Sequence, residues 1–206
     1  MEETGEVQPA LGVRVALILL GWAFVAGAIS VLIKLDLGVA PYDVLNTAIG
    51  ERLGISVGTG MWITGTIVVG VSWVLGVRPG VGTILGFFAI GAIINYLLDV
   101  LPELDSMVAR GVLLGPSLVA LYVGVCFIIL SKVGAGPTEI LMMALHKKGL
   151  SLRVSRWGIE AACAAVGGLL GGSLGVLTII IVVVAGPIIS YLLPRTSKIL
   201  TKIVGQ

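Results

Sequence analysis

The chain has 206 residues, of which 57% are hydrophobic and 12% are charged, and its mean hydropathy is +1.13. An average soluble domain has about 25% charged residues, so this composition excludes a soluble protein and indicates a membrane protein. The formal net charge of +2 provides no basic surface of the kind that binds nucleic acid.

Six apolar stretches are long enough to cross a bilayer as helices, which takes about 20 residues each. They cover residues about 13–35, 56–77, 81–101, 109–131, 154–172 and 175–193. Residues 1–10 contain three glutamates and no basic residue, unlike the positive start of a cleavable signal peptide, so we expect the first helix to remain in the mature protein. The sequence therefore predicts an all-α polytopic protein with a single membrane domain.

Two short segments between the spans have the sequence signals of helix starts and ends. The first, 41–53, begins with Pro41, carries Asp43 in its first turn and stops before Gly54. Thirteen residues make a helix of about 20 Å, which is too short to span. Such a helix either lies flat in the interface or enters and leaves the bilayer from one face as a re-entrant helix. The sequence leaves both interpretations open.

The second short segment belongs to an internal repeat. Its phrase VGAGPTEIL, with Pro137 and Glu139, matches the earlier LGVAPYDVL at an offset of 96 residues. Residues 54–98 laid on 149–193, an offset of 95, give sixteen identities in forty-five positions, and the matches include Trp, Tyr, Thr and glycines. Hydrophobicity alone would not align these residue types, so the sequence indicates a duplication.

Each predicted copy, about 13–101 and 109–193, holds three spans and one short helix. Because three is odd, the second copy would be inverted in the membrane relative to the first, as in many secondary transporters. Basic residues favour the cytoplasmic side, and ten of the thirteen Lys and Arg residues fall on the side of the chain ends. We therefore expect both termini in the cytoplasm.

Polar residues inside this apolar sequence are the candidates for a solute or ion pathway. Those at the short helices are Pro41, Asp43, Pro137 and Glu139, and those at matched span positions are Thr83, Thr178, Asn95 and Ser190. The second group fits hydrogen bonding between helices equally well. Arg156 and Glu160 share one helix face and form either a gating or coupling pair or a self-neutralising pair at the membrane boundary.

Other residue types give no sign of catalysis or of a cofactor. Cys126 and Cys163 fall inside predicted spans and are interpreted as reduced packing residues, without a disulfide or metal. The single histidine, His146, ends the second short helix and has no metal-binding or nucleophile motif around it. Glycines at 82, 86, 167, 171 and 175 have the spacing of close helix contacts, which leaves a homo-oligomer through Gly-rich faces open. We expect neither enzyme activity nor a cofactor.

Several phrases together resemble the YczE/YyaS/YitT-like integral membrane proteins of bacteria. They are LGVAPYDVL, RPGVGTIL, VGAGPTEILMMALHKKG and GLSLRVSRWGIEAA, and the resemblance covers about residues 12–193. It implies a small multi-pass protein of the bacterial inner (plasma) membrane and transfers no catalytic residue. Where that family often has Gly-Pro-Arg-Asp, this chain has Thr138 and Glu139 after Gly-Pro, so the acid is kept and the Arg is missing.

These patterns lead to two functional hypotheses. The first is a transporter or channel for a small solute or ion, with a central site between inverted repeats. Each short helix already has an acid at its start, which opposes the binding of an anion there. A cation, a proton-coupled solute or a neutral solute is therefore favoured. The alternative is a membrane protein that does not transport and instead docks or stabilises a partner.

Overall fold

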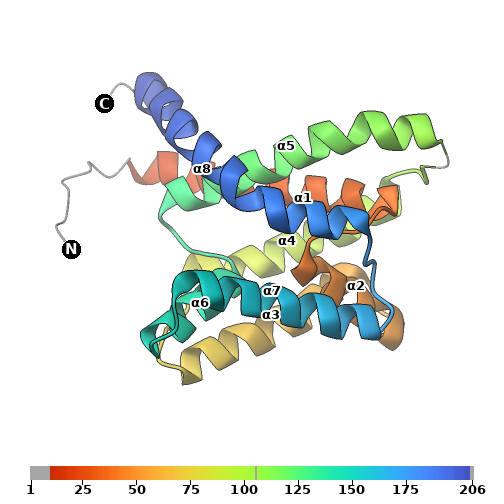
Figure 1. Ribbon diagram of the computed structural model, residues 1–206. Coiled ribbons are helices and arrows are strands. Elements are labelled where there is room, and N and C mark those ends of the chain that lie inside the picture. The colour runs from red at the N-terminus through yellow and green to blue at the C-terminus, as the bar shows by residue number, and fades with distance from the viewer. Residues whose placement is uncertain (1–9, 105, 205–206) are drawn as a thin grey trace.

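The computed structural model describes residues 10–104 and 106–204, and these residues form α-helices and no β-strand (Figure 1). The helices are α1 (Leu11–Leu35), α2 (Pro41–Leu53), α3 (Val57–Val74), α4 (Val81–Val100), α5 (Met107–Ser131), α6 (Pro137–Lys147), α7 (Leu152–Leu169) and α8 (Val176–Val204). Five of them, α1, α3, α4, α5 and α8, are long and apolar enough to cross a membrane. The predicted all-α, multi-pass membrane fold is therefore confirmed.

Two of the predicted spans differ from expectation. Helix α7 has 18 residues but contains three charged side chains, those of Arg153, Arg156 and Glu160, and burying charges in hydrocarbon opposes the insertion of an isolated helix. Helix α8 continues to Val204, well past the predicted end at residue 193. A helix need not stop where the hydrocarbon stops, because its backbone hydrogen bonds are made within the helix on either side of the boundary.

The helices pack in two groups (Figure 1). In the first group, α2 and α6 each pack on both α3 and α7, so that these four helices form a closed ring. In the second group, α1 packs on α4 and α5, and α5 packs on α8. The contact of α3 with α4 joins the ring to the second group. This arrangement packs each short helix against both α3 and α7.

Both short helices begin toward the middle of the molecule and run outward to opposite sides in Figure 1. Helix α2 starts at Pro41 after an extended Ala40, and it ends at Leu53, before Gly54, whose φ of +62° is left-handed. Helix α6 starts at Pro137 after an extended Gly136. Proline suits a first helical position because the N–H that it lacks would have no partner within the helix. Both predicted helix starts are confirmed.

The segment before α2, which we call lead-in 37–40, is bonded to the start of α8. The Val39 N–H donates to the Ser173 carbonyl at 3.2 Å, and the Leu177 N–H donates to the Leu37 carbonyl at 3.1 Å. Irregular backbone needs such partners when it is shielded from water. These two bonds therefore allow lead-in 37–40 to lie inside the protein.

The segment before α6, lead-in 133–136, is bonded in a similar way to the start of α4. The Ala135 N–H donates to Thr83 Oγ1 at 3.2 Å. A Cβ added at Gly134 would lie 2.5 Å from the Thr83 nitrogen, so only glycine allows this backbone approach. Each lead-in thus packs on a helix from the other half of the chain.

Glycines from the sequence analysis make several of the close contacts. A Cβ added at Gly82, Gly86, Gly167 or Gly175 would come within 3.0 Å of an atom from another element of the same chain. Gly171 has open space instead and takes a φ of +95°, so it serves a turn. The packing interpretation is confirmed for the first four residues, whose faces are occupied within the chain.

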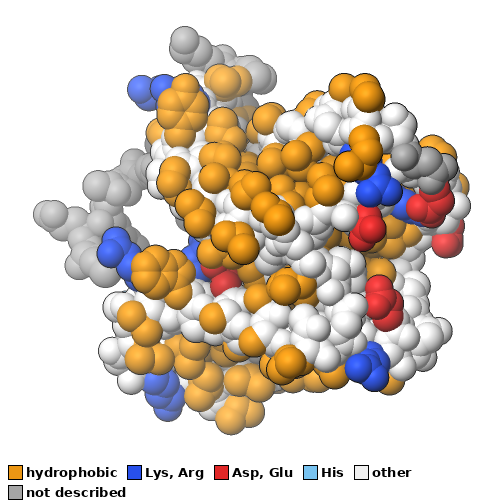
Figure 2. All heavy atoms as spheres, turned by 45° about the vertical axis from the view of Figure 1, so that its right-hand side comes forward, with side chains coloured by type: hydrophobic (Ala, Val, Ile, Leu, Met, Phe, Trp, Pro, Cys, Tyr) orange, Lys and Arg blue, Asp and Glu red, His pale blue; other side chains and the backbone are white. Residues whose placement is uncertain are grey.

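The surface in Figure 2 carries a broad apolar area, and its charged side chains gather toward two opposite ends. Large hydrophobic side chains are exposed on several helices, among them Val74, Val81, Met107, Leu169 and Val176. A soluble protein rarely exposes so much contiguous apolar surface. The spanning helices therefore present this surface to the lipid bilayer.

Candidate solute site

A cavity of about 350 Å³ is lined by residues of α1, α2, α3, α4, α5 and the start of α6 with its lead-in. Its volume lies within the range of about 300–1,000 Å³ that is usual for ligand pockets. Four of the residues predicted from the sequence line it, namely Asp43, Thr83, Pro137 and Glu139. The structure therefore brings together two acids that are almost a hundred positions apart in the chain.

Asp43 is the buried acid of this cavity, with 5% of its surface exposed. In the part of the chain that the structure describes, its carboxylate accepts one hydrogen bond, from Asn46 Nδ2 at 3.2 Å, and has no basic partner. Asp43 lies outside the five spanning helices. Burial raises the pKa of its carboxyl above the usual range, and the Asn46 bond opposes this only in part.

A hydrogen-bonded chain behind Asp43 fixes its position. Thr64 Oγ1 lies 2.5 Å from Asn46 Oδ1 and 3.0 Å from the Tyr42 hydroxyl oxygen. The single hydroxyl proton of Thr64 can serve only one acceptor at a time. When it goes to Asn46, the Tyr42 hydroxyl donates to Thr64, and the Asn46 amide is left with its N–H groups toward Asp43. The chain thus presents a fixed donor to one carboxylate oxygen.

Glu139, the second acid of the cavity, has an exposed side chain. Its Oε2 accepts a hydrogen bond from Thr138 Oγ1 at 3.2 Å. A Cβ added at Gly136 would lie 2.2 Å from Glu139 Oε2, so the carboxylate folds back over its own lead-in. The two acids at matched positions therefore differ in exposure, since Asp43 is buried and Glu139 is exposed.

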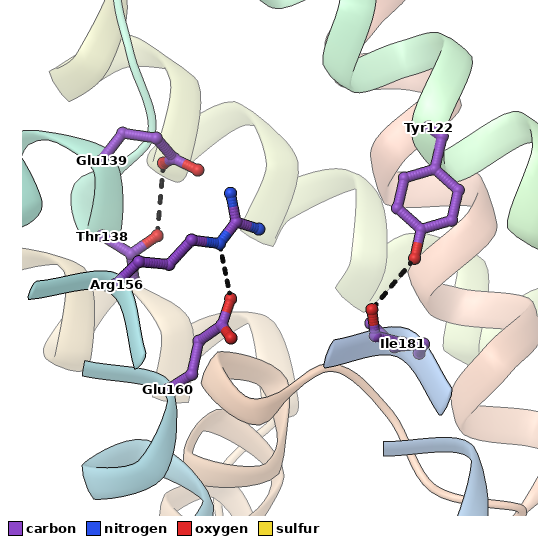
Figure 3. Close-up of polar contacts among 6 residues, drawn as sticks. All are labelled: Tyr122, Thr138, Glu139, Arg156, Glu160 and Ile181. Atoms are coloured by element: carbon purple, nitrogen blue, oxygen red, sulfur yellow. Dashed lines mark hydrogen bonds and ion pairs between the residues drawn. The ribbon is translucent and has the colours of Figure 1, made fainter. Parts of the chain in front are cut away.

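Arg156 and Glu160 form the predicted pair on α7, with Arg156 Nε donating to Glu160 Oε1 at 3.0 Å. Figure 3 shows the Arg156 side chain extending between the carboxylates of Glu160 and Glu139. On the other side of the view, the Tyr122 hydroxyl on α5 donates to the Ile181 carbonyl of α8 at 3.4 Å, a long hydrogen bond. The pair thus lies beside the exposed acid of the cavity.

The other predicted residues lie elsewhere. Thr178 is buried at the start of α8, where its Oγ1 accepts from the Gly175 N–H at 3.2 Å. Asn95 Oδ1 accepts from the Gly58 N–H at 2.8 Å and joins α4 to α3. Pro41 begins α2, and Ser190 is exposed on α8. None of these four predicted residues lines the cavity described above.

Three residues of the site were not singled out from the sequence. Tyr42 and Thr64 belong to the series of hydrogen bonds that supports Asp43, and Trp22 lines the cavity from α1. For Thr64, the sequence signal that could have indicated a role was a threonine inside an apolar span. No sequence signal connected α1 to the short helices, because that contact depends on how the helices pack.

Comparison with known proteins agrees with this fold. A model of a family of unknown function, DUF6198, matches residues 12–194. The chain belongs to this family. It is 27% identical over 172 residues to the uncharacterized membrane protein YczE of Bacillus subtilis. The aligned region covers 82% of this chain and 80% of YczE. The resemblance to the YczE/YyaS/YitT-like membrane proteins, which the sequence motifs indicated, is thereby confirmed.

A second relative is an uncharacterized protein of Haemophilus influenzae. The two chains are 25% identical over 158 residues, which is 76% of this chain and 72% of the relative. No solved structure matches this chain. The comparisons support a multi-pass membrane protein, and neither relative's name states an activity.

Proposed function

We propose that the protein moves a small solute or ion across the bacterial plasma membrane through the cavity that Asp43 and Glu139 share. The observation that carries the proposal is the unequal exposure of these two acids, one buried and one exposed, within one cavity. In a transporter that opens to one side at a time, each conformation exposes its site to one side only, and a cavity with one buried and one exposed acid fits such a conformation. Arg156 and Glu160, next to Glu139, would then act as the gating or coupling pair.

An inverted repeat is part of this proposal, and matched backbone turns support it. Of the seven described residues with positive φ, six fall at corresponding positions of the two halves, and Gly38 has no counterpart. The matched pairs are Asp36 with Lys132, Gly54 with Gly149, and Gly76 with Gly171. The helix contacts correspond as well, because α1 packs on α4 as α5 packs on α8, and α2 packs on α3 as α6 packs on α7.

Basic side chains at the ends of the short helices give further support. Arg52 Nε donates to the Leu170 carbonyl at 2.9 Å, and Lys147 Nζ donates to the Gly76 carbonyl at 3.0 Å. Arg52 and Lys147 are 95 positions apart, which is the offset of the repeat. Each satisfies a carbonyl beyond the end of a long helix from the other half, where a cation is favourable.

In this proposal α7 is the sixth span and the short helices are re-entrant. Helix α7 packs on both α2 and α6, and two of its charged side chains pair with each other. Paired charges that face the interior are the form in which charged residues are tolerated in a membrane. Helix α1 begins and α8 ends on the same side of Figure 1, as an even number of crossings requires.

Labelling tests the topology. In a background with Cys126 and Cys163 replaced by Ala, we expect Glu51→Cys to react with a membrane-impermeant maleimide on intact cells and Lys148→Cys to react only after lysis. Both positions are exposed, at the end of α2 and just after α6. Reaction of both from the same side would contradict the inverted arrangement and the cytoplasmic location of both termini.

A flux measurement tests transport. Purified protein in liposomes should take up at least one solute from a panel of cations, neutral compounds and anions above the level of protein-free vesicles. In the background without native cysteines, a neutral thiol reagent should reduce uptake by Thr138→Cys to the vesicle level, because Thr138 lines the cavity. Reagent-treated Ser56→Cys is the matched control, since Ser56 is an exposed hydroxyl residue outside the cavity.

The outcomes separate the two functional hypotheses. Uptake equal to that of empty vesicles across the panel would refute transport and would leave docking of a partner as the role of the membrane domain. Loss of uptake in both labelled variants would show that the reagent acts outside the cavity.

A further inference from the structure

We infer that the cavity accepts a monovalent organic cation, namely an amine with a compact apolar or aromatic body. The inference deepens the proposed function and rests on it, because it names the class of solute that this cavity would hold. The charge of the cavity, the chemistry of its walls and the position of Asp43 each narrow the class of solute.

The charge of the cavity favours a cation. Of its described lining residues, Asp43 and Glu139 are acidic and none is Lys, Arg or His. The neighbouring Arg156 is not part of the lining, and its Nε is bonded to Glu160. An anion in the cavity would meet two acidic side chains and no basic lining residue, and desolvation would strengthen that repulsion.

The walls favour an organic body over a bare metal ion. Trp22 and Phe87 offer aromatic surface, and aliphatic side chains from α1, α4 and α5 form most of the rest. An ammonium group near an aromatic ring gains cation–π attraction, while its hydrocarbon part gains from leaving water. Inorganic cations need several oxygen ligands at short distance, and the described residues contain no group of three or more His, Cys, Asp or Glu side chains able to hold a metal.

The position of Asp43 suggests how the charged group is held. One of its carboxylate oxygens accepts the hydrogen bond from Asn46, within the chain that continues to Thr64. An ammonium group has several donors and no acceptor, so it fits a carboxylate that still has unused acceptor sites. At a pH above the raised pKa of Asp43, an ammonium group would compensate the buried charge and a neutral solute of the same shape would not.

Three compounds of one shape test the inference: phenethylamine, 2-phenylethanol and phenylacetate. Their terminal groups are cationic, neutral and anionic, and their rings are the same. Binding to the purified full-length protein in nanodiscs is measured by isothermal titration calorimetry. The amine should bind at least about tenfold more tightly than the alcohol, a factor equal to about 1.4 kcal/mol, and phenylacetate should show no binding.

Variants assign that preference to the acids. Asp43→Asn and Glu139→Gln should each reduce the preference for the amine while leaving the weak binding of the alcohol unchanged. Glu51→Gln is the control, because Glu51 is an exposed acid on α2 outside the cavity. Since Glu139 is exposed, Glu139→Gln keeps the test valid even if Asp43→Asn does not fold.

Each outcome bears on a separate claim. Equal binding of alcohol and amine, or a preference that survives both substitutions, would overturn the cation assignment while leaving transport open. Selective amine binding without flux of any solute would support the assignment and refute transport. Flux of neutral solutes alone would support transport and refute the assignment.

Discussion

Replacing Asp43 with Asn is expected to stop solute movement and, at the same time, to make the protein more stable at about pH 8. The carboxylate is buried, accepts one hydrogen bond and has no basic partner among the described residues. Asn has nearly the same shape, its amide oxygen can still accept the bond from Asn46, and it carries no charge to desolvate. We expect a gain of about 1–3 kcal/mol, or roughly 2–10 °C in apparent melting temperature.

The stability gain should depend on pH in a defined direction. Burial raises the pKa of Asp43, so the folded protein holds a proton that the unfolded chain releases. The stability that this proton contributes is fully present below the unfolded pKa of about 3.9 and is lost as the pH rises through the higher folded pKa. The difference in melting temperature between Asp43→Asn and wild type should therefore be smaller at about pH 5 than at about pH 8.

Thermal unfolding in detergent and flux in liposomes check this prediction together. Glu51→Gln serves as the control for a lost negative charge on the same helix, and it should change neither flux nor stability. A destabilised Asp43→Asn protein would show that Asp43 holds the fold together, and the functional assignment would then fail. Unchanged flux would also contradict it.

Replacing Gly58 with Ala is expected to have the largest effect on stability. A Cβ at this position would lie 1.9 Å from the Gly91 carbonyl oxygen and 2.6 Å from Asn95 Oδ1. The first of these atoms belongs to the backbone of α4 and cannot turn away, so α3 and α4 would have to separate. Their separation would also break the bond from the Gly58 N–H to Asn95. We expect a loss of about 3 kcal/mol or more, at the upper end of the effects of overpacking.

Gly70→Ala is the matched control because Gly70 lies on the same helix with nothing within 4 Å of its would-be Cβ. It should be neutral or stabilising by up to about 1 kcal/mol, since alanine is the better helix former. Melting temperature and size-exclusion profile in detergent measure both variants. Similar losses in the two would mean that helix α3 is sensitive to any substitution, and the α3–α4 contact would not be the cause.

Local features of this protein followed directly from its sequence. Composition indicated the membrane class, and the prolines at 41 and 137 marked the starts of α2 and α6. Spacing also identified Gly82 and Gly167 as packing residues. Signals of this kind are local, because helix punctuation and close-contact spacing depend on residues within a few positions of one another.

The sequence was less successful with polar residues in the spans. From the sequence, Thr83 and Asn95 were both predicted to line the solute pathway. In the structure, Thr83 lines the cavity, whereas Asn95 joins α4 to α3. Helix periodicity indicates which residues share a face, but it does not show which neighbour that face meets. Ser190 illustrates the same limit, since its face of α8 is exposed.

The sequence by itself therefore determined that this is an all-helical membrane protein with two similar halves and two short helices that each begin with proline and an acid. Only the tertiary structure decided that Asp43 and Glu139 share one cavity and that Asp43 is buried while Glu139 is exposed. It also decided that Tyr42, Asn46 and Thr64 support the buried acid. The reason is physical. Contacts between residues far apart in the chain depend on the rotation and crossing of packed helices, which many side chains set together.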